Sequence, residues 1–139
     1  MFSKPKYVIT EDGKLIIFGG GIQHSSFQKF NPVSAGFCQI YRGNFAAFGE
    51  SVSLNVKSSP NDTEILNNKL QNKTVSFLFN ENDEPIIFID EDFNAFDLCK
   101  NPVVQGNVSF GQTTEIICDV EFNRYVLNDM VGIDQDYYF

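Results

Sequence analysis

The sequence has no tryptophan, a single histidine and only three cysteines. One imidazole cannot supply the paired histidine ligands of common zinc sites. Cys38, Cys99 and Cys118 are odd in number and widely spaced, and no CxxC pair occurs. We therefore expect neither a disulfide framework nor a thiolate metal site, and we expect all three cysteines to be small buried apolar side chains.

The scarcity of histidine also bears on catalysis. His24 precedes Ser25 and Ser26, but neighbours in sequence rarely bring a hydroxyl and an imidazole into productive geometry. The chain has no G-x-S-x-G nucleophile motif. We expect His24 to form a local hydrogen bond at the start of a short helical turn, and we expect the protein not to be an enzyme and to need no cofactor.

Long apolar runs are also missing. No stretch approaches the roughly 18–20 apolar residues that cross a bilayer. The apolar run that follows the first basic residues, Tyr7 to Thr10, is too short for the core of a cleaved leader. The sequence therefore predicts a protein without membrane contact, made in the cytoplasm.

Basic residues are scarce in the second half of the chain. Residues 1–73 carry eight Lys or Arg and five Asp or Glu, a net charge of +3, whereas residues 74–139 carry two and thirteen, a net −11. No three basic residues are consecutive, so direct nucleic-acid binding is not expected. The acidic half is interpreted as a mimic of a nucleic-acid backbone or a surface for a basic partner, as a surface for the basic half of a second copy, or as a solvated face that maintains solubility.

Turn signals between strand-like runs predict a mainly β fold. Asp12-Gly13 separates two such runs, 7–10 and 15–18, and Gly43-Asn44 separates 37–42 from 45–48. A further hairpin is predicted from 74–79 and 85–89. Between the first two, Ser25 or Ser26 is expected to begin a helical turn that carries Phe27 and Phe30.

Two alternating segments and one helix complete the prediction. Residues 51–56 and 114–123 alternate between apolar and polar side chains, which is typical of strands with one wet face. Ser59 as N-cap, Pro60 after it and leucines at 66 and 70 predict a helix over 60–71. The expected fold is an antiparallel sandwich or barrel-like domain spanning 1–139, with two β subunits, 1–73 and 74–139, as the alternative.

Two segments are candidate binding sites. Asp90, Asp92 and Asn94 have the D-x-D-x-N spacing of a calcium loop, and Asp97 follows. Ala95 stands where the sharp turn needs glycine, and no glutamate ends the loop, so we expect an acidic loop, with calcium binding as the alternative. Tyr137, Tyr138 and Phe139, at the end of the chain, are expected to dock on the protein itself or on a partner.

Four stretches of the first half, Tyr7–Lys14, His24–Phe27, Ser34–Phe37 and Gly49–Ser51, carry a resemblance. Over residues 6–72 the chain resembles a small uncharacterised family from phages, including crAss-like phages, and mobile elements of Bacteroidota. The resemblance implies a viral or mobile-element context, in a virion or in the host cytoplasm. It assigns no chemistry to any residue.

These observations favour a function carried by surfaces. The leading hypothesis is a non-enzymatic, self-associating structural protein, such as a minor or decorating component of a phage particle. The alternative is an accessory protein that binds and blocks a host defence protein or its nucleotide signal. Both hypotheses make a protein, or a second copy of this chain, the expected partner.

Overall fold

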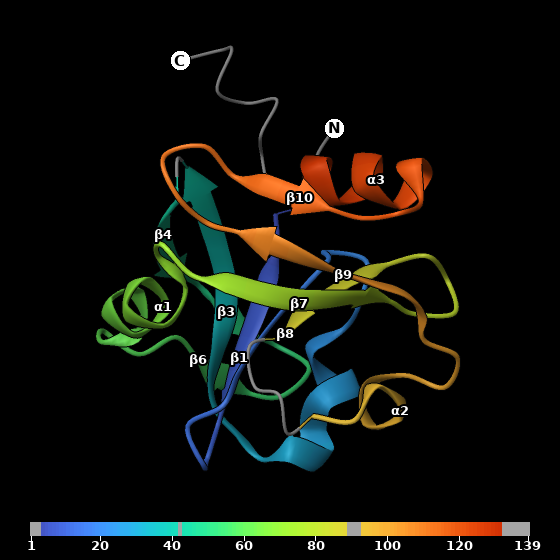
Figure 1. Ribbon diagram of the computed structural model, residues 1–139. Helices are drawn as coiled ribbons and strands as arrows, with labels where there is room; N and C mark the ends of the chain where they lie inside the picture. Colours follow the sequence, from blue (N-terminus) through green and yellow to red (C-terminus); the bar gives the residue numbers. More distant parts are fainter. Residues whose placement is uncertain (1–3, 42, 89–92, 132–139) are drawn as a thin grey trace.

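A computed structural model describes residues 4–41, 43–88 and 93–131 of the chain. It confirms the predicted mainly β, antiparallel fold, with an eight-stranded sheet curled into a half-barrel (Figure 1). The elements are β1 (Lys6–Thr10), β2 (Leu15–Phe18), the 3₁₀ helix η1 (His24–Phe30), β3 (Pro32–Tyr41), β4 (Asn44–Phe48), β5 (Glu50–Ser51), β6 (Val56–Lys57), α1 (Asp62–Leu70), β7 (Thr74–Phe79), β8 (Pro85–Phe88), α2 (Ala95–Leu98), β9 (Val103–Ser109), β10 (Glu115–Ile117) and α3 (Glu121–Val131).

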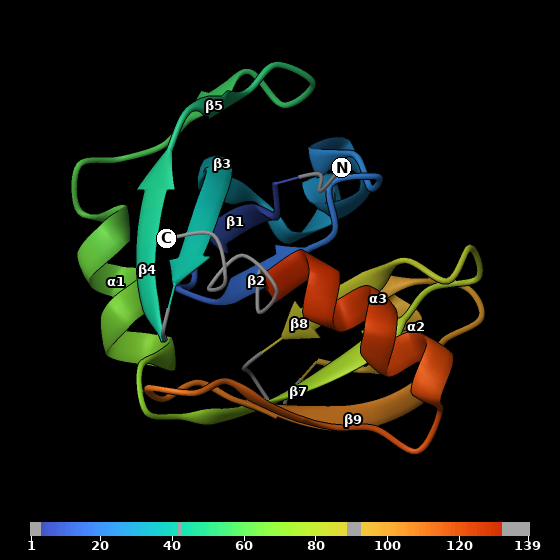
Figure 2. The ribbon, with the colours of Figure 1, turned by 90° about the horizontal axis from the view of Figure 1, so that it is seen from above.

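The strand order in the large sheet is β10-β9-β7-β8-β2-β1-β3-β4. Four strands come from each half of the chain, and the pairing of β2 with β8 joins the two sets. The strands wrap round in an arc, with α1 beside β4 (Figure 2). The third helix, α3, lies across one end of the curl (Figure 1). The sheet therefore has two edges, β4 and β10.

The predicted hairpins form because their turns suit the residues there. Gly13 has φ +83°, in the left-handed region that glycine adopts without strain, and β1 pairs with β2 around it. In the β7–β8 hairpin, Asn80 Oδ1 accepts hydrogen bonds from the backbone N–H groups of Asn82 and Glu84, both at 2.9 Å. The hairpin predictions, including the β3–β4 pair, are confirmed.

Alternation along the central strands creates two apolar cores. Tyr7 and Ile9 point into one core together with Leu66 and Leu70 of α1 and Leu127 of α3. The other core lies on the opposite face of the sheet and is covered by η1 and α2; it contains Val8, Ile16, Phe18, Phe27, Leu78, Phe88 and Leu98. Because neighbouring residues enter different cores, the sheet is buried on both sides.

The predicted strand at 114–123 is wrong beyond its first residues. Only Glu115–Ile117 is extended, and the chain then forms the helix α3. Asn123, Leu127 and Met130 are buried, and their spacing of four and three residues is that of one helix face. The segment carries both a two-residue and a helical period, and packing on the first core selects the helix.

The predicted continuous strand at 51–56 is wrong over residues 52–55. These residues form a turn between the short strands β5 and β6, and Val52 in the turn is 86% exposed. Ser51 Oγ accepts a hydrogen bond from the backbone N–H of Leu54 at 3.1 Å, and Asn55 has φ +55°. Short polar side chains that bond nearby backbone favour turns over strands.

The helix predicted over 60–71 is confirmed as α1, with a different start. Asn61, and not Ser59, is the N-cap residue, and its side chain forms no capping bond. Instead the buried carboxylate of Asp62 accepts hydrogen bonds from the Ser59 backbone N–H, the Tyr7 hydroxyl and the Ser34 hydroxyl. These bonds fasten the first turn of α1 to β1 and β3, so the carboxylate has a structural role.

Candidate functional site

The predicted acidic loop is only partly described. Asp90 and Asp92 lie outside the described residues. Asn94 Oδ1 accepts a hydrogen bond from the Phe96 backbone N–H at 2.9 Å and so caps α2, while Asp97 is exposed on that helix. No group of three or more metal-ligating side chains occurs among the described residues. The calcium alternative stays a prediction.

His24 lies where the sequence predicts, at the start of the short helix η1. Its Nε2 is 2.8 Å from the Gly36 carbonyl oxygen, and its ring meets Phe18 and Phe37 edge-on, at centroid distances of 5.5 and 5.7 Å. Burial lowers the pKa of His24. The local hydrogen bond is confirmed, and the residue ties η1 to β3.

The cysteines follow their expected burial in two of three cases. Cys38 and Cys118 are buried, whereas Cys99 is half-buried, and all three have free thiols. Burial raises the pKa of the Cys38 thiol, so the reactive thiolate form is disfavoured. Cys38 and Cys118 belong to the first core.

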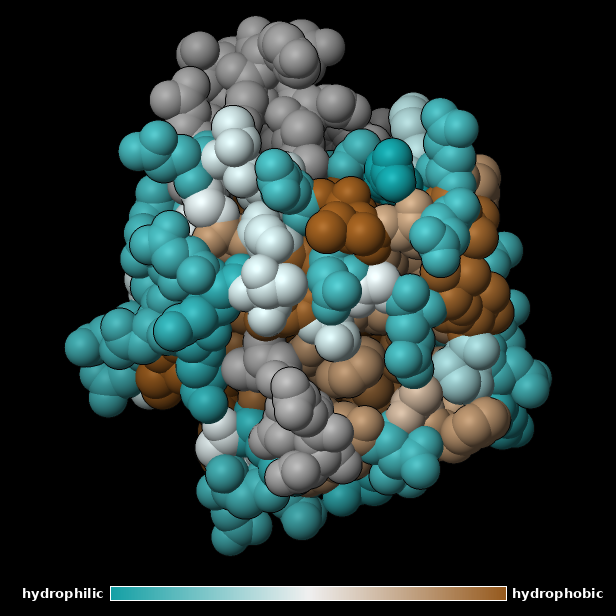
Figure 3. Space-filling view, viewed as in Figure 1, coloured by the Kyte–Doolittle hydropathy of each residue, from teal (hydrophilic) through white to brown (hydrophobic). Residues whose placement is uncertain are grey.

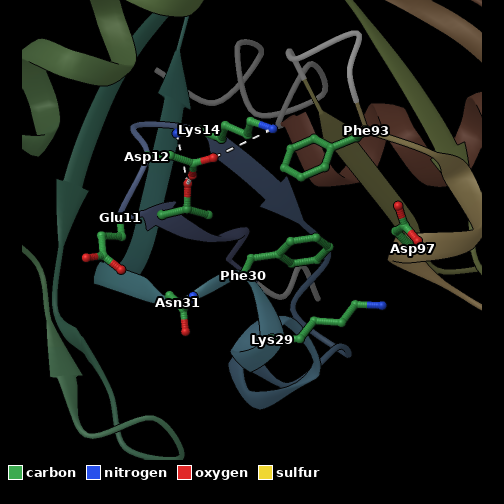
Figure 4. Close-up of a pocket in the computed structure, with 9 residues that line it drawn as sticks. Glu11, Asp12, Lys14, Lys29, Phe30, Asn31, Phe93 and Asp97 are labelled. Atoms are coloured by element: carbon green, nitrogen blue, oxygen red, sulfur yellow. Dashed lines mark hydrogen bonds and ion pairs between the residues drawn. The ribbon is translucent and has the colours of Figure 1, made fainter.

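A cavity of about 480 Å³ opens between the β1–β2 turn, the end of η1 and the segment that leads into α2 (Figure 4). Phe30 and Phe93 meet edge-to-face at its centre, with ring centroids 5.2 Å apart. Five charged side chains also line the cavity: Glu11, Asp12, Lys14, Lys29 and Asp97. In this cavity Asp97 of the predicted loop lies together with residues of the first half of the chain.

The backbone of the edge strand β4 forms hydrogen bonds with side chains of helix α1. Along β4, the Phe45 backbone N–H donates to Asn67 Oδ1, and Asn67 Nδ2 donates to the Phe45 carbonyl, both at 2.9 Å. The Ala47 N–H donates to Thr63 Oγ1 at 2.9 Å. Both side chains belong to α1, so this helix occupies the place of a ninth strand and bonds the backbone of β4 at Phe45 and Ala47.

The other edge, β10, pairs with β9 alone among the described strands. Ile117, the last residue of β10, is 58% exposed, and Phe122 and Tyr125 in the first turns of α3 are each 62% exposed. Figure 3 shows apolar side chains at the surface over β9 and β10. We call the strand β10 together with Ile117, Val120, Phe122 and Tyr125 the β10 surface; Val120 is also exposed.

Partner binding is predicted from the sequence at Tyr137, Tyr138 and Phe139, which lie outside the described residues, so that prediction is untested. The exposure of Phe122 and Tyr125 was not predicted, because the two-residue period put residue 122 on the buried face of a strand. Their three-residue spacing, offset from the buried positions 123, 127 and 130, is the helical signal that would have revealed them.

Comparisons of the chain with protein-family models, with curated proteins and with solved structures gave no significant match. Over the described residues, none of the helices combines the length and the apolar character required to span a bilayer.

Proposed function

We propose that the protein is a non-enzymatic structural protein that self-associates, and that two copies join through the β10 surface. The observation that carries the proposal is the difference between the two sheet edges. The backbone of β4 is bonded by α1, whereas β10 adjoins exposed apolar side chains. An accessible edge strand offers a row of backbone donors and acceptors to another chain.

A two-fold contact is the simplest geometry for such an edge. With antiparallel pairing centred on Ile116, each Glu115 lies opposite Ile117 of the second copy, so equal charges do not oppose each other across the pair. Three residues of strand give few hydrogen bonds. The exposed rings of Phe122 and Tyr125 supply the apolar area that such a short strand lacks.

The charge of the β10 surface distinguishes this contact from the alternative interpretation of the sequence. Glu115, Asp119 and Glu121 are exposed near β10, and Arg124 is the one basic residue close by in sequence. Two copies of one acidic surface repel, so added salt strengthens a two-fold contact. A contact between the basic half of one copy and the acidic half of another weakens with salt.

The resemblance of residues 6–72 gives the proposal its setting. In a phage or mobile element, a small self-associating β protein fits a minor or decorating component of the particle. This part of the proposal depends on the resemblance, and the β10 surface does not depend on it.

Light scattering with mass determination, over a range of protein and salt concentrations, tests the proposal. The expected mass rises from 15.7 kDa toward twice that value, and more readily at high salt. Ile117→Lys, and separately the pair Phe122→Ser and Tyr125→Ser, are expected to keep the protein monomeric. Val52→Lys, at an exposed position in the β5–β6 turn, is the matched control and should associate normally. A wild-type protein that stays monomeric at high concentration would contradict the proposal.

A further inference from the structure

We propose that the cavity beneath the β1–β2 turn binds an organic cation, specifically the guanidinium or ammonium group of an Arg or Lys side chain on a partner protein. The cavity lies between β1–β2, η1 and α2 (Figure 4). The inference is separate from the β10 surface, and its test does not depend on self-association.

The aromatic rings are the first support. Lys14 Nζ lies 5.0 Å from the centroid of Phe93, and Lys29 Nζ lies 5.3 Å from the centroid of Phe30. Both rings thus have an ammonium group over them, within the distance at which the ring quadrupole attracts a cation, and a partner cation would displace one of these lysine groups. Phe93 is buried and Phe30 is half-buried, so the ring of Phe30 is the more accessible of the two to a partner cation.

The charges that line the cavity are the second support. Three carboxylates and two ammonium groups line the cavity, and the side chain of Glu11 points away from the rings (Figure 4). Asp12 is engaged, since it accepts a hydrogen bond from Thr10 Oγ1 and lies 3.7 Å from Lys14 Nζ. Among the described residues, Glu11 and Asp97 form no ion pair. A guanidinium on the rings can therefore pair with the carboxylate of Asp97, whereas an anion would be repelled by the net negative charge of the lining.

The size of the cavity fits a long basic side chain. A volume of about 480 Å³ is within the range of ligand sites in proteins. The rings of Phe30 and Phe93 offer apolar surface to the methylene groups of the stem, while the charged head reaches Asp97 at the rim. An aromatic pair beside a carboxylate suits both parts of an Arg or Lys side chain.

NMR titration of the isotope-labelled protein tests the inference. The probes are N-acetyl-arginine methylamide, agmatine, the uncharged analogue N-acetyl-norleucine methylamide, and adenosine monophosphate as the anion. We expect saturable shifts in residues 10–14, 29–31 and 93–97 with the arginine probe, and no saturation with the norleucine or nucleotide probes. Tighter binding of the arginine probe than of agmatine supports a protein side chain as the source of the cation. Tighter binding of agmatine would overturn that source.

Two variants make the test specific. Asp97→Asn removes an exposed carboxylate, and Phe30→Leu keeps apolar volume while removing a ring. Each is expected to weaken binding of the arginine probe by about three- to tenfold. Asp119→Asn, which removes an exposed carboxylate far from the cavity in sequence and outside its lining, is the control and should bind as the wild type does. Unchanged affinity in Asp97→Asn, or saturable binding of the nucleotide alone, would overturn the inference.

Discussion

The side-chain amide of Asn67 bonds the backbone of Phe45 in both directions, accepting from its N–H and donating to its carbonyl at 2.9 Å each. A residue of a neighbouring strand would form the same two hydrogen bonds with Phe45, through its backbone carbonyl and N–H. It means that α1 covers an edge of the sheet as well as packing Leu66 and Leu70 into the core. The function proposed for β10 depends on this contrast between the edges.

Asn67→Ala should therefore destabilise the protein more than a substitution at an exposed position of the same helix does. The substitution leaves the N–H and carbonyl of Phe45 without their partners, and we expect a loss of about 1–3 kcal/mol in the free energy of unfolding. Urea denaturation measures the loss. Asn68→Ala, next to it on the exposed face of α1, is the control and should change stability by less than about 0.5 kcal/mol. Equal effects of the two variants would show that Asn67 does not hold the edge.

Tyr7→Phe tests the bonds that fasten α1 to the sheet. The substitution removes only the hydroxyl that donates to the buried carboxylate of Asp62. Because a buried carboxylate then loses one of its partners, the expected loss is about 1–3 kcal/mol in the free energy of unfolding. Tyr125→Phe removes a hydroxyl from an exposed ring and serves as the control. The prediction fails if the two substitutions destabilise equally.

Stability should fall as the pH drops below about 6.5, the ordinary pKa of histidine. Burial, aided by Lys6 and opposed by the bond to Gly36, lowers the pKa of His24 in the folded protein. As the pH falls below about 6.5, His24 is therefore protonated in the unfolded chain before it is protonated in the folded one. The free energy of unfolding decreases until the pH reaches the lowered pKa of His24 in the folded protein. Since His24 is the single histidine, urea denaturation between pH 5 and 7 reports on it directly.

The comparison for this pH effect is His24→Gln, which has no group that titrates in that range. Its free energy of unfolding should vary less with pH than that of the wild type, whose slope is at most about 1.4 kcal/mol per pH unit for one proton. Parallel pH profiles of the two proteins would contradict the assignment to His24.

Gly106→Ala tests how β10 is attached. A Cβ at this position would lie 2.2 Å from the Ile117 carbonyl oxygen and 2.8 Å from the Phe77 ring. We expect a loss of about 1–3 kcal/mol from overpacking, with faster hydrogen exchange in β10. Gly111→Ala, where the nearest atom is 3.8 Å away, is the control and should leave β10 protected. Unchanged exchange in the Gly106 variant would mean that β10 does not depend on this close approach.

Much of the fold could be predicted from local sequence, because turn chemistry and strand propensity agree there. Gly13 marks a turn that only a few residues can form, and Leu66 and Leu70 lie one helical turn apart. The errors fall where two periods coexist. Residues 114–123 alternate as a strand does, yet Asn123 and Leu127 bury a helix face, and the core decides between the two.

The candidate sites were harder to predict, because they combine distant segments. Asp97 was expected in an acidic loop, with calcium binding as the alternative, and the structure places it in the lining of one cavity with Phe30 and Lys29, nearly seventy residues earlier in the chain. The bonds from α1 to β4 likewise join residues about twenty positions apart, such as Asn67 and Phe45. Neither contact can be predicted from spacing in the sequence, because each joins segments that only the curled sheet brings together.

Hydrogen exchange measured at low and high protein concentration tests most directly whether two copies join through β10, because it reports on both sheet edges in one experiment. We expect backbone amides of β10 to exchange more slowly at high concentration, while those of β4, already bonded to α1, keep their rates. A slowing at β4, or a concentration-dependent mass with no change at β10, would contradict this expectation.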